Sequence, residues 1–247
     1  MKAEPAHQVR LLDLQETDSR IAQLAHRLRT LPENEEVRRL DARIGGLRDT
    51  HTSLTTALSD LDREQRKAES DVDQVRTRAE RDAKRLDSGQ VGSPKDLEHL
   101  QSEIASLQRR QTELEEIVLE VMERREGLES RERQARTELE QAEAERDAVE
   151  ERRATAVGGI EADRATEATR RERIAGELPE DLLAFYTKLR DQNEGVGAAA
   201  LRYGRCEGCK LALSTAELSE IRQTPAEEVV RCEQCRRILV RTTDSGI

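Results

Sequence analysis

Aromatic residues are almost missing from this 247-residue chain, which contains no tryptophan, two tyrosines and one phenylalanine. Phe185, Tyr186 and Tyr203 all lie in the last third, so residues 1–184 must fold without any aromatic side chain. Only 35% of the residues are hydrophobic, whereas 38% are charged. This composition disfavours a single compact globule and favours helices that share a narrow apolar seam.

Long apolar runs are missing as well. No stretch of about 18 apolar residues occurs, and the first residues lack the apolar core of a signal peptide, so we expect a soluble, cytoplasmic protein without a membrane partner. The net charge is −10, and residues 1–195 carry 45 acidic and 34 basic side chains. This long part should repel nucleic acid, whereas residues 196–247, with seven acidic and eight basic side chains, are nearly neutral.

Apolar residues recur at alternating steps of three and four along two long series, residues 37–86 and 97–174. This spacing predicts two coiled-coil helices. A shorter helical series precedes them and is out of phase with the first. Pro32 lies at the discontinuity, and because proline removes a backbone donor, we expect a break near residues 31–34.

The segment between the two long series, residues 87–93, is predicted to be a turn. It contains two glycines, and Ser93 and Pro94 suit the N-cap and the first position of the following helix. Because the turn is short, the helices must be antiparallel. The resulting register places His51 opposite Glu132, where we expect the histidine either to set the register or to point outward, and not to be catalytic.

These patterns divide the chain into two predicted domains. Residues 1–178 form the antiparallel coiled-coil hairpin, and polar seam positions late in its second helix predict loose pairing at the base. Residues 179–247 form a short helix, over residues 180–192, followed by a small cysteine-containing domain. The predicted fold of the first domain is therefore a long antiparallel coiled-coil helical hairpin.

Four cysteines form two C-x2-C pairs that are 22 residues apart: Cys206 with Cys209, and Cys232 with Cys235. Each pair can present two thiolates from one tight turn, and two such turns complete a tetrahedral zinc site. Four sulfur ligands leave no position for water or substrate, so we expect one structural Zn²⁺ that stabilises a segment too small to fold alone. An iron site and a redox-active dithiol pair are the alternatives.

Strand-like segments surround the cysteines, at residues 198–205, 228–231 and 237–241, which indicates a ribbon instead of a helical finger. The predicted fold of the whole chain is therefore mainly α, a long antiparallel coiled-coil helical hairpin with a small C-terminal β zinc ribbon. Between the cysteine pairs, Ser214 and Glu217 match a capping box that opens a short helix.

With these features the chain resembles the bacterial C4-type zinc-ribbon proteins with an N-terminal coiled-coil hairpin, described as nucleic-acid-binding or adaptor proteins. The resemblance spans the whole chain, but its specific residues lie near the end: Phe185 and Tyr186, Gly195 and Gly197, the two cysteine pairs, and Arg237, Ile238 and Leu239. It implies that the four cysteines bind zinc and that the activity is not enzymatic.

Two positions depart from the pattern of that family. Glu233 follows the third cysteine, where the family usually has proline, and Arg236 follows the fourth, where it usually has glycine. A left-handed backbone at Arg236 would cost about 1–2 kcal/mol relative to glycine.

Seven ribbon residues are candidates for binding nucleic acid or a partner: Arg202, Tyr203, Arg205, Arg231, Arg236, Arg237 and Arg241. Guanidinium groups suit phosphate oxygens, and Tyr203 can stack on a base. An acidic protein partner would fit the same arginines. The alternative is that they are solvated side chains paired with nearby glutamates.

These observations favour a non-enzymatic adaptor that binds a protein partner or nucleic acid through the ribbon and the hairpin. The alternatives are a nucleic-acid-binding protein that acts in transcription or post-transcriptional regulation, a redox-switched chaperone that releases zinc, and a rod that inserts its acidic tip into RNA polymerase. The chain has no P-loop, no dinucleotide-binding glycine motif and only scattered histidines, so no enzyme is expected.

Overall fold

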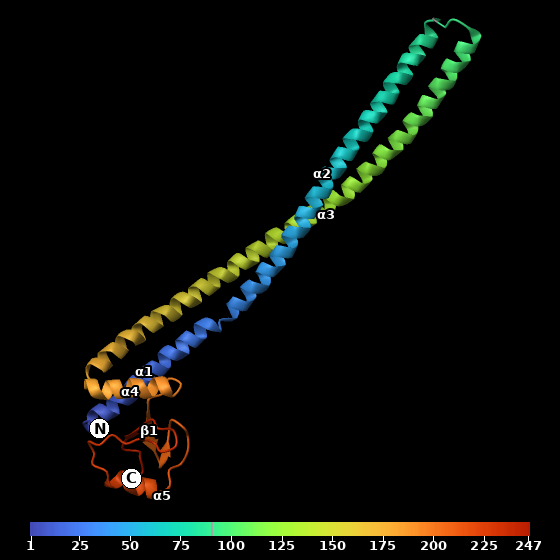
Figure 1. Cartoon of the computed structure of the whole chain (residues 1–247). Coiled ribbons are helices and arrows are strands. Elements are labelled where there is room, and N and C mark those ends of the chain that lie inside the picture. Colours follow the sequence, from blue (N-terminus) through green and yellow to red (C-terminus); the bar gives the residue numbers. More distant parts are fainter. Residues whose placement is uncertain (90) are drawn as a thin grey trace. The chain divides into compact units, whose positions relative to one another are not determined.

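The computed structural model describes residues 1–89 and 91–247; Gln90, within the predicted turn, lies outside the described residues. The fold is the mainly α coiled-coil hairpin with a small β ribbon that the sequence predicts (Figure 1). Its elements are α1 (Pro5–Arg29), α2 (Pro32–Asp87), α3 (Pro94–Gly176), α4 (Glu180–Gln192), β1 (Ala198–Arg202), β2 (Arg205–Cys206), α5 (Thr215–Gln223) and β3 (Ile238–Arg241). In the part of the chain that the structure describes, no helix combines the length and the apolar character needed to span a membrane.

The chain divides into two compact units. We call residues 35–150 the coiled-coil unit, and residues 1–34 together with 151–247 the ribbon unit. The ribbon unit therefore extends beyond the predicted domain of residues 179–247, because α1 and the last turns of α3 contribute to its core.

In the coiled-coil unit, α2 and α3 lie side by side and bury one narrow seam of small and aliphatic residues (Figure 1). Polar side chains link the two helices at the edges of this seam. His51 Nε2 lies 2.9 Å from Glu132 Oε1, so the predicted register is confirmed. Exposed pairs such as Glu64 with Arg124 (2.7 Å) and Arg48 with Glu143 (2.6 Å) contribute little energy but agree with the antiparallel arrangement.

The break between α1 and α2 lies at two residues, Thr30 and Leu31. The Thr30 N–H donates to the His26 carbonyl at 3.0 Å and closes α1. Pro32 then opens α2, a position where its missing N–H leaves no intrahelical hydrogen bond unmade.

The core of the ribbon unit joins α1, the end of α3, α4 and the sheet. Its largest cluster contains Leu11, Leu14, Ile174, Leu178, Leu182, Tyr186, Leu189, Ala198, Ile238 and Val240. A second contact, formed by Leu24, Leu31 and Ile160, joins α1 to an earlier part of α3. The loose pairing predicted for the end of α3 is therefore not observed, because α1 supplies the apolar partner.

The sheet has the order β2-β1-β3, with β1 antiparallel to β2 and parallel to β3. Both of its faces are covered. Ala198, Ile238 and Val240 face the cluster of α1 and α4, and the alternate residues Ala199 and Leu239 face a smaller cluster within the ribbon.

The strand predicted at residues 228–231 is not formed. This segment makes two isolated bridges instead, Lys2 with Glu228 and Arg231 with Ile238. The first residues of the chain pair with one edge of this segment, since the Ala3 N–H donates to the Glu227 carbonyl at 2.7 Å. A contact of this sequence separation leaves no periodic pattern in the sequence.

Candidate metal centre and the ribbon surface

The first cysteine pair lies at the end of β2 and in the turn that follows. The Lys210 N–H donates to the Cys206 carbonyl at 2.8 Å, and the Cys206 N–H donates to the Leu211 carbonyl at 3.0 Å. These two hydrogen bonds close a tight turn. They hold Cys206 and Cys209 so that both thiols point to the same side.

The second pair, just before β3, repeats this turn. The Arg236 N–H donates to the Cys232 carbonyl at 2.8 Å, and the Cys232 N–H donates to the Arg237 carbonyl at 3.0 Å. Donor and acceptor positions match those of the first turn residue for residue. The ribbon therefore contains two equivalent zinc-knuckle turns.

Both turns end in a left-handed residue. Lys210 and Arg236 each have φ +63°, a conformation in which L-residues other than glycine are strained. Arg236 thus adopts the backbone that the family pattern assigns to glycine. Gly208, inside the first turn, is needed for space, because a Cβ there would lie 3.0 Å from both the Ala199 Cβ and the Arg237 Cδ.

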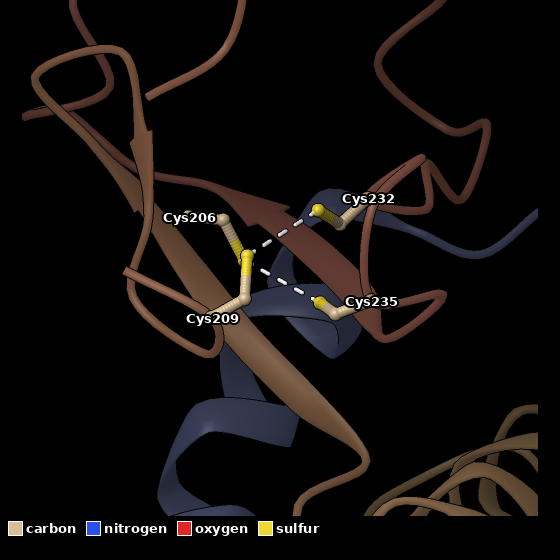
Figure 2. Close-up of side chains that lie close together, drawn as sticks. All are labelled: Cys206, Cys209, Cys232 and Cys235. Carbon is tan, nitrogen blue, oxygen red and sulfur yellow. Dashed lines mark hydrogen bonds between the residues drawn. The ribbon is translucent and has the colours of Figure 1, made fainter. Parts of the chain in front are cut away.

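The four thiols converge on one point (Figure 2). All four Sγ atoms lie within 4.8 Å of one another, and the Cys206–Cys235 and Cys209–Cys232 Sγ pairs are each 3.9 Å apart. A tetrahedron with Zn–S distances of about 2.3 Å has S···S separations of about 3.8 Å. The cluster therefore has the size and donor set of one structural Zn²⁺ with a closed sulfur shell.

The pKa values of the cysteine thiols differ within the cluster. Burial, with the neighbouring cysteines, raises the pKa of Cys206 to about 12, and burial raises the pKa of Cys232. For Cys235, burial is outweighed by hydrogen bonds from the backbone and side chain of Arg237, which lower its pKa to about 7. Four adjacent thiolates, two of them buried and two partly buried, repel one another, and a divalent cation removes that repulsion.

Three of the seven candidate binding residues have structural roles. The Arg241 guanidinium donates to four backbone carbonyls, those of residues 224, 225, 226 and 228, each at 2.8 Å. Arg237 donates to the Val196 and Asn193 carbonyls. Arg231 donates to the Arg236 carbonyl at 2.8 Å and lies over the Phe185 ring, 5.7 Å from its centroid. These arginines bind carbonyls and a ring, not the glutamates considered from the sequence.

The other four candidates are exposed, although Arg205 also donates to the Lys210 carbonyl at 3.2 Å. Arg202, Tyr203 and Arg205 lie together at the turn that joins β1 to β2. We call residues 202–205 the hairpin tip; it belongs to the β-hairpin of the ribbon and not to the coiled-coil hairpin. Arg236 lies at the second knuckle turn, where its carbonyl accepts from Arg231. The seven candidates therefore do not form one binding surface: three share one turn, and most of the others hold the ribbon backbone.

A buried polar group in the ribbon unit was missed from the sequence. The Asp18 carboxylate, whose side chain is 8% exposed, accepts from Arg171 at 2.5 Å, Arg190 at 3.1 Å and the Tyr186 hydroxyl at 2.8 Å. Burial raises the pKa of Asp18, but these three hydrogen bonds outweigh burial and the pKa is lowered. The pKa of Tyr186 is raised by burial and by Asp18.

Gln15, one turn before Asp18, is part of the same group. Its Oε1 accepts from the Gly197 N–H at 2.7 Å, and its Nε2 donates to the Gly195 carbonyl at 3.0 Å. A Cβ at Gly197 would lie 2.7 Å from the Tyr186 carbonyl oxygen. Tyr186 and Gly197, noted in the sequence only by resemblance, are therefore packing residues, whereas Gly195 adopts a left-handed backbone with φ +91°. The sequence does contain one signal of this group, because two polar residues, Gln15 and Asp18, lie on the apolar face of α1.

A coiled-coil hairpin joined to a closed four-thiolate ribbon defines a class of metal-stabilised structural proteins. The chain belongs to the family of the CT398-like coiled coil hairpin domain, whose model matches residues 14–194, and a C4-type zinc ribbon domain matches residues 205–239. The resemblance inferred from the sequence is thus confirmed, and the two matched models indicate no enzymatic family.

Similar proteins come from several bacteria. The uncharacterized protein Rv2229c of Mycobacterium tuberculosis is 34% identical over 241 residues, which are 98% of each chain. A solved structure from Mycobacterium smegmatis is 35% identical with a TM-score of 0.87, over 98% of this chain and 100% of that one. CT398 from Chlamydia trachomatis shares the fold at 17% identity, with a TM-score of 0.70 over 96% and 98% of the two chains.

Proposed function

We propose that this chain is a non-enzymatic adaptor whose zinc ribbon binds single-stranded nucleic acid through the hairpin tip. Two features support a binding role. The four-sulfur site has no open coordination position, so its metal can stabilise the ribbon but cannot activate a water or a substrate. The matched family domains are a coiled coil hairpin and a C4-type zinc ribbon, and neither indicates an enzymatic family.

The observation that carries the proposal is the position of Tyr203. Its side chain is 78% exposed, although an aromatic ring gains most free energy when it is buried. Its backbone is left-handed, with φ +48°, and Gly204 follows with φ +71°, as in a two-residue type I′ hairpin. Asparagine is the usual residue at that first turn position, so tyrosine is conformationally costly there.

The backbone of the hairpin tip is fixed while the ring is exposed. The Tyr203 N–H donates to the Asp244 carbonyl at 2.8 Å, and the Gly204 N–H donates to the Ser245 carbonyl at 3.0 Å. A rigid backbone lowers the entropy that must be lost when a ligand binds the ring. The tip therefore presents a preorganised aromatic platform.

The charges beside this platform suit a phosphate backbone. Arg202 and Arg205 flank the turn, and Lys210 lies at the end of the adjacent knuckle turn, where it pairs with Glu207 at 2.5 Å. A stacked base with cations on both sides is the arrangement by which proteins hold single strands without reading sequence. A small exposed tip can also contact a single base, whereas a protein partner with a flat surface would need a broader contact area.

Fluorescence anisotropy with labelled single-stranded RNA and DNA of about 20 nucleotides tests the proposal. We expect Tyr203→Ala to weaken binding about 10-fold, because base stacking on an aromatic side chain is worth about 1–3 kcal/mol. Tyr203→Phe keeps the ring and should bind as the unchanged protein does. Binding should also weaken steeply between about 50 and 200 mM salt.

The matched control is Arg222→Ala, which removes an exposed arginine from α5 of the same unit. It should have a smaller effect than Arg202→Ala or Arg205→Ala. Absence of binding at low salt, or equal binding by Tyr203→Ala, contradicts the proposal. We also propose a cytoplasmic location, since a reducing compartment keeps four thiols available for metal.

A further inference from the structure

A second binding surface lies in the coiled-coil unit, on one flank of the α2–α3 pair. A groove of about 470 Å³ is lined by Glu69, Val72 and Asp73 from α2 and by Glu115, Val118 and Leu119 from α3. Its floor is aliphatic and its rim carries carboxylates. We call it the acidic groove.

Large apolar side chains extend the floor of the acidic groove into solvent. Leu119 is 60% exposed, and Met122, three residues later and on the same side of α3, is 46% exposed. Neither contributes to the buried seam, where Leu114 and Val121 lie instead. Two neighbouring exposed aliphatic side chains beside a groove are typical of a surface that receives a partner.

The rim of the acidic groove carries negative charge that the chain only partly neutralises. Asp73 pairs with Arg76 at 2.6 Å, but Glu69 and Glu115 accept hydrogen bonds from the uncharged amides of Gln65 and Gln111. The two facing stretches, residues 60–73 and 111–126, together contain 12 acidic and five basic side chains. A ligand with positive charge beside an apolar face would match both properties.

We propose that the acidic groove binds a basic amphipathic helix of a partner protein. Such a helix presents aliphatic residues at positions i, i+3, i+4 and i+7, which can pack on Val118, Leu119 and Met122. Lysine or arginine at the flanks of that face would then meet Glu69 and Glu115. Nucleic acid does not suit this surface, because phosphates would meet carboxylates. A second copy of this chain would likewise place its own acidic rim against this one.

This surface is independent of the hairpin tip, which lies in the other unit. An adaptor with both surfaces can hold a nucleic acid and a protein at the same time. The inference goes beyond the proposed function, and each can fail without the other, because Tyr203→Ala should leave binding at the acidic groove unchanged.

The full-length zinc-loaded protein is titrated into a fluorescein-labelled synthetic helix of about 18 residues, with leucines on one face and lysines elsewhere. Leu119→Ala/Met122→Ala should weaken binding at least about 10-fold, as for truncation of central apolar contacts. The matched control is Leu97→Ala/Ile117→Ala. It truncates two other exposed side chains of α3, at 39% and 41% exposure, and Ile117 lies about 200° around the helix from Leu119. It should bind as the unchanged protein does.

The charge contribution is tested separately. Glu69→Gln/Glu115→Gln should weaken binding about 3- to 10-fold and reduce its salt dependence. The control Asp71→Asn/Glu120→Gln removes the same charge from the same stretch but from the opposite flank, and its effect should be smaller. A scrambled peptide of the same composition, and one with glutamate in place of lysine, should bind much more weakly.

Three results would overturn the proposal. The first is equal weakening by the Leu119/Met122 variant and its control, and the second is equal binding of the amphipathic and scrambled peptides. The third is self-association of the unchanged protein in sedimentation that the Leu119/Met122 variant abolishes, since the occupant would then be a second copy. Selective loss of peptide binding in a variant that keeps its helical circular dichroism supports the groove.

Discussion

In the coiled-coil unit the buried side chains form one narrow seam, whereas the ribbon unit buries side chains on both faces of a small sheet. The charges differ in the same way. The coiled-coil unit contains 30 acidic and 21 basic residues, and the ribbon unit contains 22 acidic and 21 basic residues. The first unit therefore repels polyanions. The second contains nearly equal numbers of acidic and basic residues, which the fold can separate into local surfaces of one charge.

The two units also use ion pairs differently. Those that join α2 and α3 are mostly exposed, and each contributes a few tenths of a kcal/mol at most. In the ribbon unit, the Asp18 side chain and two of the four cysteines are buried, and the other two cysteines are partly buried; all of them depend on specific partners. A seam tolerates the loss of one contact because the others remain. The ribbon unit should be more sensitive, because a single substitution leaves a buried charge or a metal ligand without its partner.

The largest effect should follow removal of the metal. We expect Cys232→Ser, or a strong chelator, to unfold the ribbon, since structural zinc sites supply on the order of 10 kcal/mol. Hydrogen exchange should show lost amide protection over residues 198–241 and retained protection over residues 35–150. Elemental analysis of the unchanged protein should find one zinc per chain. Retained protection of the ribbon without metal would contradict the structural role of zinc.

The next effect should come from the buried carboxylate. Asp18→Asn should lower the free energy of unfolding by about 3 kcal/mol, because a buried carboxylate is lost and two partly buried arginines lose their counter-charge. Urea denaturation measures this change. Asp13→Asn, five residues earlier on α1, is the control; its half-exposed pair with Arg10 should be worth less than about 1 kcal/mol.

The pH dependence of this difference has a definite sign. Because the folded-state pKa of Asp18 lies below its unfolded value of about 3.9, its stabilisation is complete above that pH. It is lost as the pH falls through the folded-state pKa. The gap between the unchanged protein and Asp18→Asn should therefore be constant above about pH 5 and should shrink in acid. A gap that widens in acid would contradict this assignment.

A smaller effect is expected from the seam of the coiled-coil unit. Leu114 is 5% exposed, and Leu114→Ala should cost about 2–3 kcal/mol through lost burial and the cavity left behind. Leu119→Ala, one and a half turns later on the same helix, should change stability by less than about 0.5 kcal/mol. Thermal denaturation followed by circular dichroism compares the two. Equal losses of stability would mean that Leu119 belongs to the buried seam and not to the exposed acidic groove.

The smallest expected effect is an increase in the stability of the ribbon unit. Arg236→Gly removes the strain of a left-handed arginine and should stabilise the ribbon unit by about 1 kcal/mol. The Arg236 carbonyl that accepts from Arg231 is kept in this variant. Arg222→Gly, an arginine in helical conformation on α5, should instead cost about 1 kcal/mol. A loss of stability in both variants would show that the Arg236 side chain has a contact of its own.

Periodic and local features could be read directly from the chain. The heptad series predicted the hairpin and its register, down to the His51–Glu132 pair, because each contact repeats along two helices of fixed geometry. The two C-x2-C pairs predicted the zinc site for a similar reason, since each knuckle turn is closed by hydrogen bonds between residues four or five positions apart. The capping box of Ser214 and Glu217 is present in the structure as expected.

Features that depend on contacts between distant segments could not be read in this way. The sequence did not reveal that α1 packs on the end of α3 and on the sheet, that residues 1–3 pair with residues 227–229, or that Asp18 lies between Arg171 and Arg190. It also grouped seven ribbon residues as equals, although Arg237 and Arg241 bind backbone carbonyls and Tyr203 is exposed.

The amino-acid sequence by itself thus determined the helical hairpin, the metal ligands and the class of protein, because periodicity and short spacing fix those features locally. Only the tertiary structure decided which arginines are structural, which aromatic ring faces solvent and which flank of the coiled coil exposes apolar side chains. These properties depend on which groups from remote parts of the chain become neighbours, and burial and hydrogen bonding are settled only when those neighbours are in place.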